Sequence, residues 1–308
     1  MYPYDLLPGV DLYFIFLCLA IVSAIVVYRI MSDKLKIGAK LYNFGLFTAV
    51  ISIIVGYLSA VLFQGFYNIA TYGKFYIRGA TFYGGLIGGA GCFLVIYFLV
   101  GKAMFKENKE HISRFFDIAD IAACSIAIAH SLGRVGCLMV GCCHGKPTAA
   151  WFGIKMVTLG YKVVPTQLFE AIFLAVLFVY LILRVKDKQT YCLQIYMCVY
   201  GIWRFIIEYM RNDYRGTTIV DALTPSQLTA VLMVLGGAAL IYLQYRVTNR
   251  DETDSLVTEN EASQETVSEF SESVESAEDD DEEEEYDYAS VYQKKDDTAD
   301  KADQTKDE

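Results

Sequence analysis

Seven stretches of about 20 mostly apolar residues recur along the first 245 residues of this chain. A helix of that length crosses the hydrocarbon core of a bilayer, since each residue adds about 1.5 Å. The stretches are approximately 10–30, 41–63, 79–100, 117–140, 165–183, 190–210 and 223–245. We therefore predict an all-α polytopic membrane protein with about seven transmembrane helices, and we exclude an ordinary soluble fold.

Charge is divided unevenly between this apolar body and the C-terminal segment. The chain has a formal net charge of −10, yet residues 251–308 hold 24 of the 36 acidic residues and only four of the 26 basic ones. This segment lacks an apolar period, and a sequence of that kind cannot bury enough surface to fold. We predict a transmembrane domain at 1–246 and an acidic, disordered cytoplasmic tail at 247–308.

The loop charges predict an orientation in the membrane. Alternate connections between the spans carry eleven Lys and Arg residues on one side and seven on the other. Because the more basic loops face the cytoplasm, the N-terminus is expected outside and the C-terminus inside. The segments 64–78, 141–164 and 211–222 then face the exterior of a multi-pass protein in the cell (plasma) membrane.

A histidine and an arginine interrupt the span 117–140. His130 and Arg134 are four residues apart, so a helix places them on one face. A guanidinium in hydrocarbon costs at least about 2.5–3.5 kcal/mol and is retained only where something pairs with it. A phosphate is a suitable partner, because the planar fork of arginine matches two phosphate oxygens.

A polar stripe runs along the span 190–210. Tyr200, Arg204, Glu208 and Arg211 recur at helical spacing. An internal Arg204–Glu208 ion pair is one interpretation. Positive charge still remains on the stripe, and Arg134 adds more. Uncompensated cations at membrane depth indicate function, so we predict a site near the outer leaflet that binds an anionic lipid headgroup.

Small residues follow Tyr83 in the third span. Gly84 and Gly85 begin a glycine-rich segment that lets another helix, or a lipid, approach the backbone. Plain helix packing is an equal alternative, and Tyr83 is also typical of an interfacial aromatic residue.

The fifth and seventh spans open with similar phrases, Pro-Thr-Gln-Leu at 165–168 and Pro-Ser-Gln-Leu at 225–228. Gln167 and Glu170 lie about one turn into the fifth span, where Glu170 either anchors the surface or faces an arginine. Thr224 is placed to cap the seventh.

Taken together, these residues resemble the prolipoprotein diacylglyceryl transferase family. The resemblance covers most of residues 1–246 and rests on four segments. They are F-Y-G-G-L-I-G at 82–88, G-R-V-G at 133–136, P-T-Q-L-F-E-A at 165–171, and Y-G-x-x-R-F-x-x-E-x-x-R at 200–211.

The resemblance implies an enzyme of lipoprotein biosynthesis without a cofactor or a nucleic-acid partner. It would take diacylglyceryl from phosphatidylglycerol, pass it to the lipobox cysteine thiol of a prolipoprotein, and release glycerol phosphate. Arg134 and Arg204 would bind the phosphate and stabilise the leaving group. The residues expected to bind or orient the substrate are Gly84, Gly85, Gly133, Gly136, Gln167, Glu170, Tyr200, Glu208 and Arg211.

The chain departs from the family pattern around this site. Tyr83 stands where the family usually has a histidine proposed as the base, and Cys137, Val140 and Cys142 replace Asn, Asn and Glu. These departures leave two alternatives open. One is a paralogue with the same lipid donor and another acceptor, and the other is a non-catalytic lipid-binding protein or transporter.

His130 is the predicted replacement for the missing base, with Tyr83 as a further catalytic candidate. A neutral imidazole is suited to taking a proton from a thiol near pH 7. The alternative is a packing histidine bonded to a carbonyl.

Eight cysteines do not form a disulfide framework, because most lie inside apolar runs. Cys137, Cys142, Cys143 and His144 lack the spacing of a closed zinc site. We expect structural cysteines, or a disulfide at the oxidising face, rather than a metal.

Overall fold

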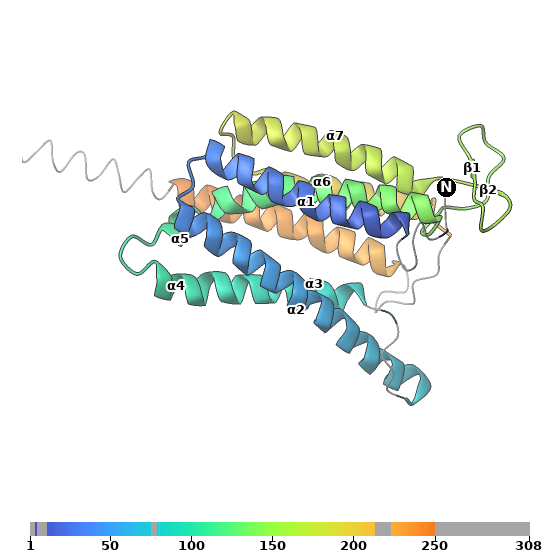
Figure 1. Ribbon diagram of the computed structural model, residues 1–308, viewed down its shortest axis with the longest axis horizontal. Coiled ribbons are helices and arrows are strands. Elements are labelled where there is room, and N and C mark those ends of the chain that lie inside the picture. The colour runs from blue at the N-terminus through green and yellow to red at the C-terminus, as the bar shows by residue number, and fades with distance from the viewer. Residues whose placement is uncertain (1–3, 5–10, 75–78, 80, 213–222, 250–308) are drawn as a thin grey trace, which may run out of the picture. The chain divides into compact units, whose positions relative to one another are not determined.

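The computed structural model describes residues 4, 11–74, 79, 81–212 and 223–249 of the chain (Figure 1). It divides into two compact units, Met1–Gln244 and Tyr245–Glu308. Every residue discussed below as part of a site lies in the first unit. The predicted acidic tail falls almost entirely within 250–308, outside the described residues.

Helices make up nearly all of the described chain. They are α1 (Leu12–Lys34), α2 (Ala39–Tyr72), α3 (Phe82–Val95), α4 (Gly101–Met104), α5 (Glu110–Ser113), α6 (Phe115–Val140), α7 (Thr166–Lys186), α8 (Cys192–Glu208) and a last helix, Pro225–Asn249. A π-helical turn, Ile96–Val100, joins α3 to α4 without a break.

Among the described residues, six helices are long and apolar enough to cross a membrane. They are Leu12–Lys34, Ala39–Ile69, Tyr83–Met104, Phe115–Val140, Thr166–Lys186 and Pro225–Asn249. Large apolar side chains on their outer faces are exposed, including Ile53 (71%) and Val176 (66%). The fold is therefore that of a multi-pass helical membrane protein. The predicted span 190–210 corresponds to α8, which at 17 residues is shorter than the others.

The helix α6 contacts more of the bundle than its neighbours do. It packs against α1, α7 and α8, while α2 packs against α3. Gly136 makes the approach of α1 possible, because a Cβ there would lie 3.2 Å from side-chain atoms of Tyr13 and Phe16. This packing places the polar face of α6 against the first turns of α7 and the last turns of α8.

A small antiparallel hairpin follows α6 where the sequence indicated only an exterior loop. Its strands are β1 (Ile154–Lys155) and β2 (Lys162–Val163). The loop also joins the end of α8, since Lys146 N donates to Met210 O at 2.9 Å and Gly145 bridges Arg211. Figure 1 shows the hairpin beyond the end of α6 and the start of α7.

The last helix begins with a reciprocal cap. Gln227 N donates to Thr224 Oγ1 at 3.2 Å, and Thr224 N donates to Gln227 Oε1 at 3.0 Å. This is a capping box, and it satisfies two backbone donors at the helix start. The predicted Thr224 cap is confirmed.

Candidate functional site

A buried ion pair joins α6 to α7. Arg134 Nη2 lies 3.0 Å from Glu170 Oε1, and the Glu170 side chain has no exposed surface. Glu170 therefore faces an arginine, and the surface-anchor interpretation of this residue is wrong. The pairing reduces the cost of a guanidinium at membrane depth, which a lone arginine would bear in full.

Two further side chains approach the same carboxylate. Tyr200 OH, from α8, donates to Glu170 Oε1 at 2.6 Å. His130 lies with Nε2 4.0 Å from that oxygen and 3.4 Å from Tyr200 OH. Its Nδ1 is 3.2 Å from Tyr196 OH, so its contacts are two tyrosine hydroxyls rather than a carbonyl.

Arg204 occupies a second polar cluster at the end of α8. Its Nη2 donates to Ser226 Oγ at 2.7 Å and lies 2.8 Å from Glu208 Oε2. Thr224 Oγ1 donates to Glu208 Oε1 at 3.0 Å, and Arg211 Nε lies 3.9 Å from Glu208 Oε2. The polar stripe thus makes both an internal ion pair and contacts with the last helix.

The two clusters form one electrostatic unit around Glu170. This carboxylate interacts with Arg204 as well as with Arg134. With His130 neutral, the combined cluster has a net charge of +1. The charged residues counted are Arg134, Arg204, Arg211, Glu170 and Glu208. The cluster can accommodate one further negative charge, such as that of a phosphodiester.

Several polar atoms in the cluster are buried without a hydrogen-bond partner among the residues that the structure describes. They include Nε of Arg134, Nη1 of Arg204 and Oε2 of Glu170. Buried donors of this kind are rare in folded proteins and need an explanation. Two guanidinium groups that each retain a donor are suited to binding an anion.

Tyr83 and Arg204 both contact the start of the last helix. Its hydroxyl donates to Pro225 O at 2.5 Å and accepts from Thr229 Oγ1 at 3.1 Å. The first turn of the last helix therefore contacts Tyr83 through Pro225 and Arg204 through Ser226. Tyr83 is therefore hydrogen-bonded to the same helix that contacts Arg204.

The candidate glycines fall into two groups. A Cβ on Gly84 would lie 2.7 Å from Phe63 Cβ, and one on Gly85 would lie 3.4 Å from Ala60 Cβ, so both face α2. Gly136 faces α1. A Cβ on Gly133 would meet no described atom within 4 Å. Helix packing explains Gly84, Gly85 and Gly136, and Gly133 leaves open space beside Arg134.

The start of α7 is tied to the residues that follow α6. Gln167 is fully buried, and its Nε2 donates to Cys142 O. Thr166 Oγ1 donates to Cys143 O at 3.1 Å. Hydrogen bonds from the Cys137 and Cys142 thiols, together with the positive charge of Arg211, lower the pKa of the Cys143 thiol. Through its hydrogen bond to Cys142 O, Gln167 positions α7, the helix that carries Glu170.

Three residues that contact the site were not expected from the sequence. Ser226, Tyr196 and Thr166 each bond a site side chain or a neighbouring loop. Ser226 and Thr166 had a sequence signal, since they lie in the similar phrases at 225–228 and 165–168, and Tyr196 had none.

A cavity of about 330 Å³ lies elsewhere in the bundle. Its lining includes Lys34 at the end of α1, Arg114 before α6 and Val185 near the end of α7. Arg114 and Arg134 are 20 residues apart, roughly 30 Å along a helix, so the cavity is separate from the arginine cluster.

Comparison with known proteins places the chain in a family. A family model described as prolipoprotein diacylglyceryl transferase matches residues 6–243. The chain belongs to the prolipoprotein diacylglyceryl transferase family. The match includes every candidate residue described above.

Individual members of the prolipoprotein diacylglyceryl transferase family are similar over part of their length. Phosphatidylglycerol–prolipoprotein diacylglyceryl transferase 2 of Clostridium perfringens is 33% identical over 57% of this chain and 66% of its own length. The Clostridium tetani protein is 30% identical over 52% and 62%, respectively. The Dehalococcoides mccartyi protein is 28% identical over 72% and 85%. The chain therefore matches slightly less than two thirds of the first two relatives.

Proposed function

We propose that this protein is an enzyme that transfers the diacylglyceryl group of phosphatidylglycerol to the lipobox cysteine thiol of a prolipoprotein. The products are a thioether and glycerol phosphate. The observation that carries the proposal is that Arg134, paired with Glu170, and Arg204, paired with Glu208, each keep a buried guanidinium donor that has no described partner. The shared family and the names of the relatives support it.

The chemistry follows from where negative charge develops. The thiol sulfur attacks the glyceryl carbon, the carbon–oxygen bond to phosphate breaks, and the electron pair leaves on the phosphate oxygen. Arg134 and Arg204 bind the phosphodiester and stabilise the charge that grows on it, which lowers the barrier. Glu170, Glu208 and Tyr200 hold the two guanidinium groups in place.

His130 is proposed as the base that accepts the thiol proton. It lies on α6 one turn before Arg134, in contact with Tyr196 and Tyr200. The acceptor thiol belongs to the substrate, so no cysteine of this chain acts as the nucleophile. Gly133 beside Arg134 is the proposed point of closest approach for the lipid.

We further propose that the site faces the outer leaflet of the cell membrane, with the N-terminus outside and the C-terminus in the cytoplasm. The bias in loop charge supports this orientation. The chemistry is assigned to residues 1–246, with no part for 247–308.

The test is transfer by the full-length protein in detergent. Phosphatidylglycerol labelled in its diacylglyceryl group is incubated with a lipobox peptide, and labelled thioether peptide is measured. Arg134→Lys and Arg204→Lys keep the charge but lose the fork, so each is expected to reduce the rate about 10- to 100-fold. Arg29→Lys, in an exposed pair with Asp33, is the matched control and should keep wild-type activity.

The alternatives give different products in the same assay. Release of glycerol phosphate without labelled peptide would indicate another acceptor. Binding of the lipid with neither product would contradict an enzyme and support a lipid-binding protein or transporter.

A further inference from the structure

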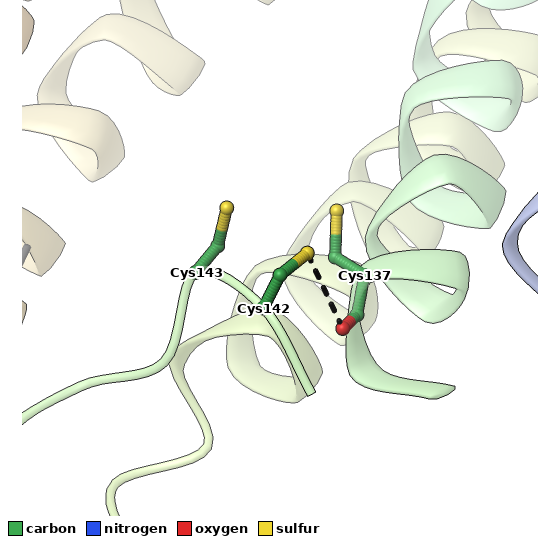
Figure 2. Close-up of side chains that lie close together, drawn as sticks. All are labelled: Cys137, Cys142 and Cys143. Atoms are coloured by element: carbon green, nitrogen blue, oxygen red, sulfur yellow. Dashed lines mark hydrogen bonds between the residues drawn. The ribbon is translucent and has the colours of Figure 1, made fainter. Parts of the chain in front are cut away.

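Three cysteine thiols gather at the end of α6. The Sγ atoms of Cys137, Cys142 and Cys143 all lie within 4.8 Å of one another. Figure 2 shows Cys137 on the last turns of the helix and the other two on the loop that turns back beside it. All three are free thiols, and Cys142 is exposed. A soluble reagent or ion can therefore reach the cluster.

The backbone holds this arrangement in place. Gly141 adopts a left-handed conformation (φ 78°), and Cys142 N donates to Cys137 O at 3.1 Å, so the chain reverses at the end of the helix. Cys143 is also left-handed (φ 60°), which is uncommon for a residue with a side chain. The bonds from Thr166 and Gln167 to the carbonyls of Cys143 and Cys142 fix the loop.

We propose that Cys137, Cys142 and Cys143 form a three-thiolate site for one thiophilic metal ion, Zn²⁺ or Cu⁺. Metal–sulfur bonds of about 2.3 Å place bound sulfurs roughly 4 Å apart, close to the spacing here. Thiolates select these two ions over the hard cations Mg²⁺ and Ca²⁺. A disulfide would use only two of the three thiols and would leave the convergence of the third unexplained.

One thiol of the cluster, that of Cys143, ionises more readily than an ordinary cysteine. Hydrogen bonds from the Cys137 and Cys142 thiols, together with the positive charge of Arg211, lower its pKa. Binding of one divalent ion would displace the remaining thiol protons, and three thiolates with that ion carry a net charge of −1. The converging ligand atoms are those of the three cysteines and do not include His144, whose Nδ1 lies 3.0 Å from Gly145 O.

The site would stabilise the segment that supports the arginine cluster. The same loop carbonyls hold Thr166 and Gln167 in the first turn of α7, just before Glu170. A bound metal would lock the loop to the end of α6. Its binding is independent of the proposed transfer reaction and is measured without it.

The test is metal binding by the full-length, reduced protein in detergent. Zn²⁺ and Cu⁺ are each titrated against a chromophoric chelator, and one equivalent of at least one ion is expected to bind. Cys137→Ser, Cys142→Ser and Cys143→Ser should each weaken the affinity at least about tenfold. Cys18→Ser and Cys92→Ser, outside the cluster, are the matched controls and should leave it unchanged.

A second measurement uses only the wild-type chain, so misfolding of a variant cannot imitate the result. Saturating metal should reduce the number of maleimide adducts in the intact mass by three. Failure of the reduced protein to bind either ion would overturn the proposal. The proposal would also be overturned if the native protein had a mass lower by two hydrogens, with a disulfide mapped within the cluster, and bound no metal after reduction.

Discussion

Glu170 is a carboxylate of α7 without exposed surface, and groups from two other helices share it. It pairs with Arg134 of α6, accepts from Tyr200 of α8, and interacts with Arg204. Removing one member of such a set leaves the others as buried, uncompensated charges, which costs far more than the intact pair contributes. Glu170 therefore links the stability of the bundle to the geometry of its site.

Glu170→Gln is expected to destabilise the protein by about 3–5 kcal/mol, because Arg134 loses its buried partner. Unfolding of the purified protein in detergent measures the change. Glu107→Gln removes an exposed carboxylate and serves as the control, with no measurable effect expected. A Glu170→Gln protein as stable as wild type would contradict the ion-pair role.

Substitution of His130 tests the proposed chemistry more directly than substitution of the arginines does. It lies close to Tyr196, Tyr200 and Glu170 without being the principal partner of Arg134. His130→Ala is expected to abolish transfer while expression and folding persist, since general-base catalysis is typically worth 10²–10⁴-fold. The labelled-peptide assay measures the rate, and full activity in this variant would remove the assignment of the base.

At the scale of elements, glycines determine how closely α2 and α3 pack. A Cβ on Gly88 would lie 2.4 Å from Ser59 Cβ and Oγ, and one on Gly56 would lie 3.1 Å from Gly85 O. The glycine-rich segment is therefore a helix-packing surface, in which missing side chains allow two backbones to approach. A role for Gly84 and Gly85 in substrate binding stays a prediction.

Gly88→Leu is expected to force α3 away from α2 and to destabilise the protein by at least about 1–3 kcal/mol. Gly91→Leu, one turn further along α3, is the control, because no described atom lies within 4 Å of its Cβ position. Size-exclusion profiles and thermal unfolding in detergent compare the two. Equal behaviour of the variants would show that the contact between α2 and α3 does not depend on Gly88.

At the scale of the whole molecule, the proposed orientation places the loop after α6 outside the cell. Ala149 in that loop and Glu107 between α4 and α5 are both exposed and lie on opposite sides of the membrane in the proposal. In a chain whose native cysteines are replaced by serine, Ala149→Cys should react with an impermeant maleimide on intact cells. Glu107→Cys should react only after permeabilisation. The reverse pattern would invert the orientation.

The sequence by itself determined that this is a multi-pass helical membrane protein, and it located the long helices approximately. Apolar length is a local property, because a helix satisfies its own backbone hydrogen bonds and needs only enough apolar residues to cross lipid. All seven predicted spans correspond to helices, although α8 is shorter than the other six. The spacing of His130 and Arg134, and that of Arg204 and Glu208, likewise placed each pair on one face.

The tertiary structure alone decided which of these side chains meet. Glu170 had two open interpretations, and the packing of α7 on α6 selected the one facing Arg134. Arg204 bonds Ser226, which is 22 residues away in the sequence. The three cysteine thiols of the cluster converge because the chain reverses at Gly141. Such contacts depend on how helices pack against one another, and local periodicity carries no information about that packing.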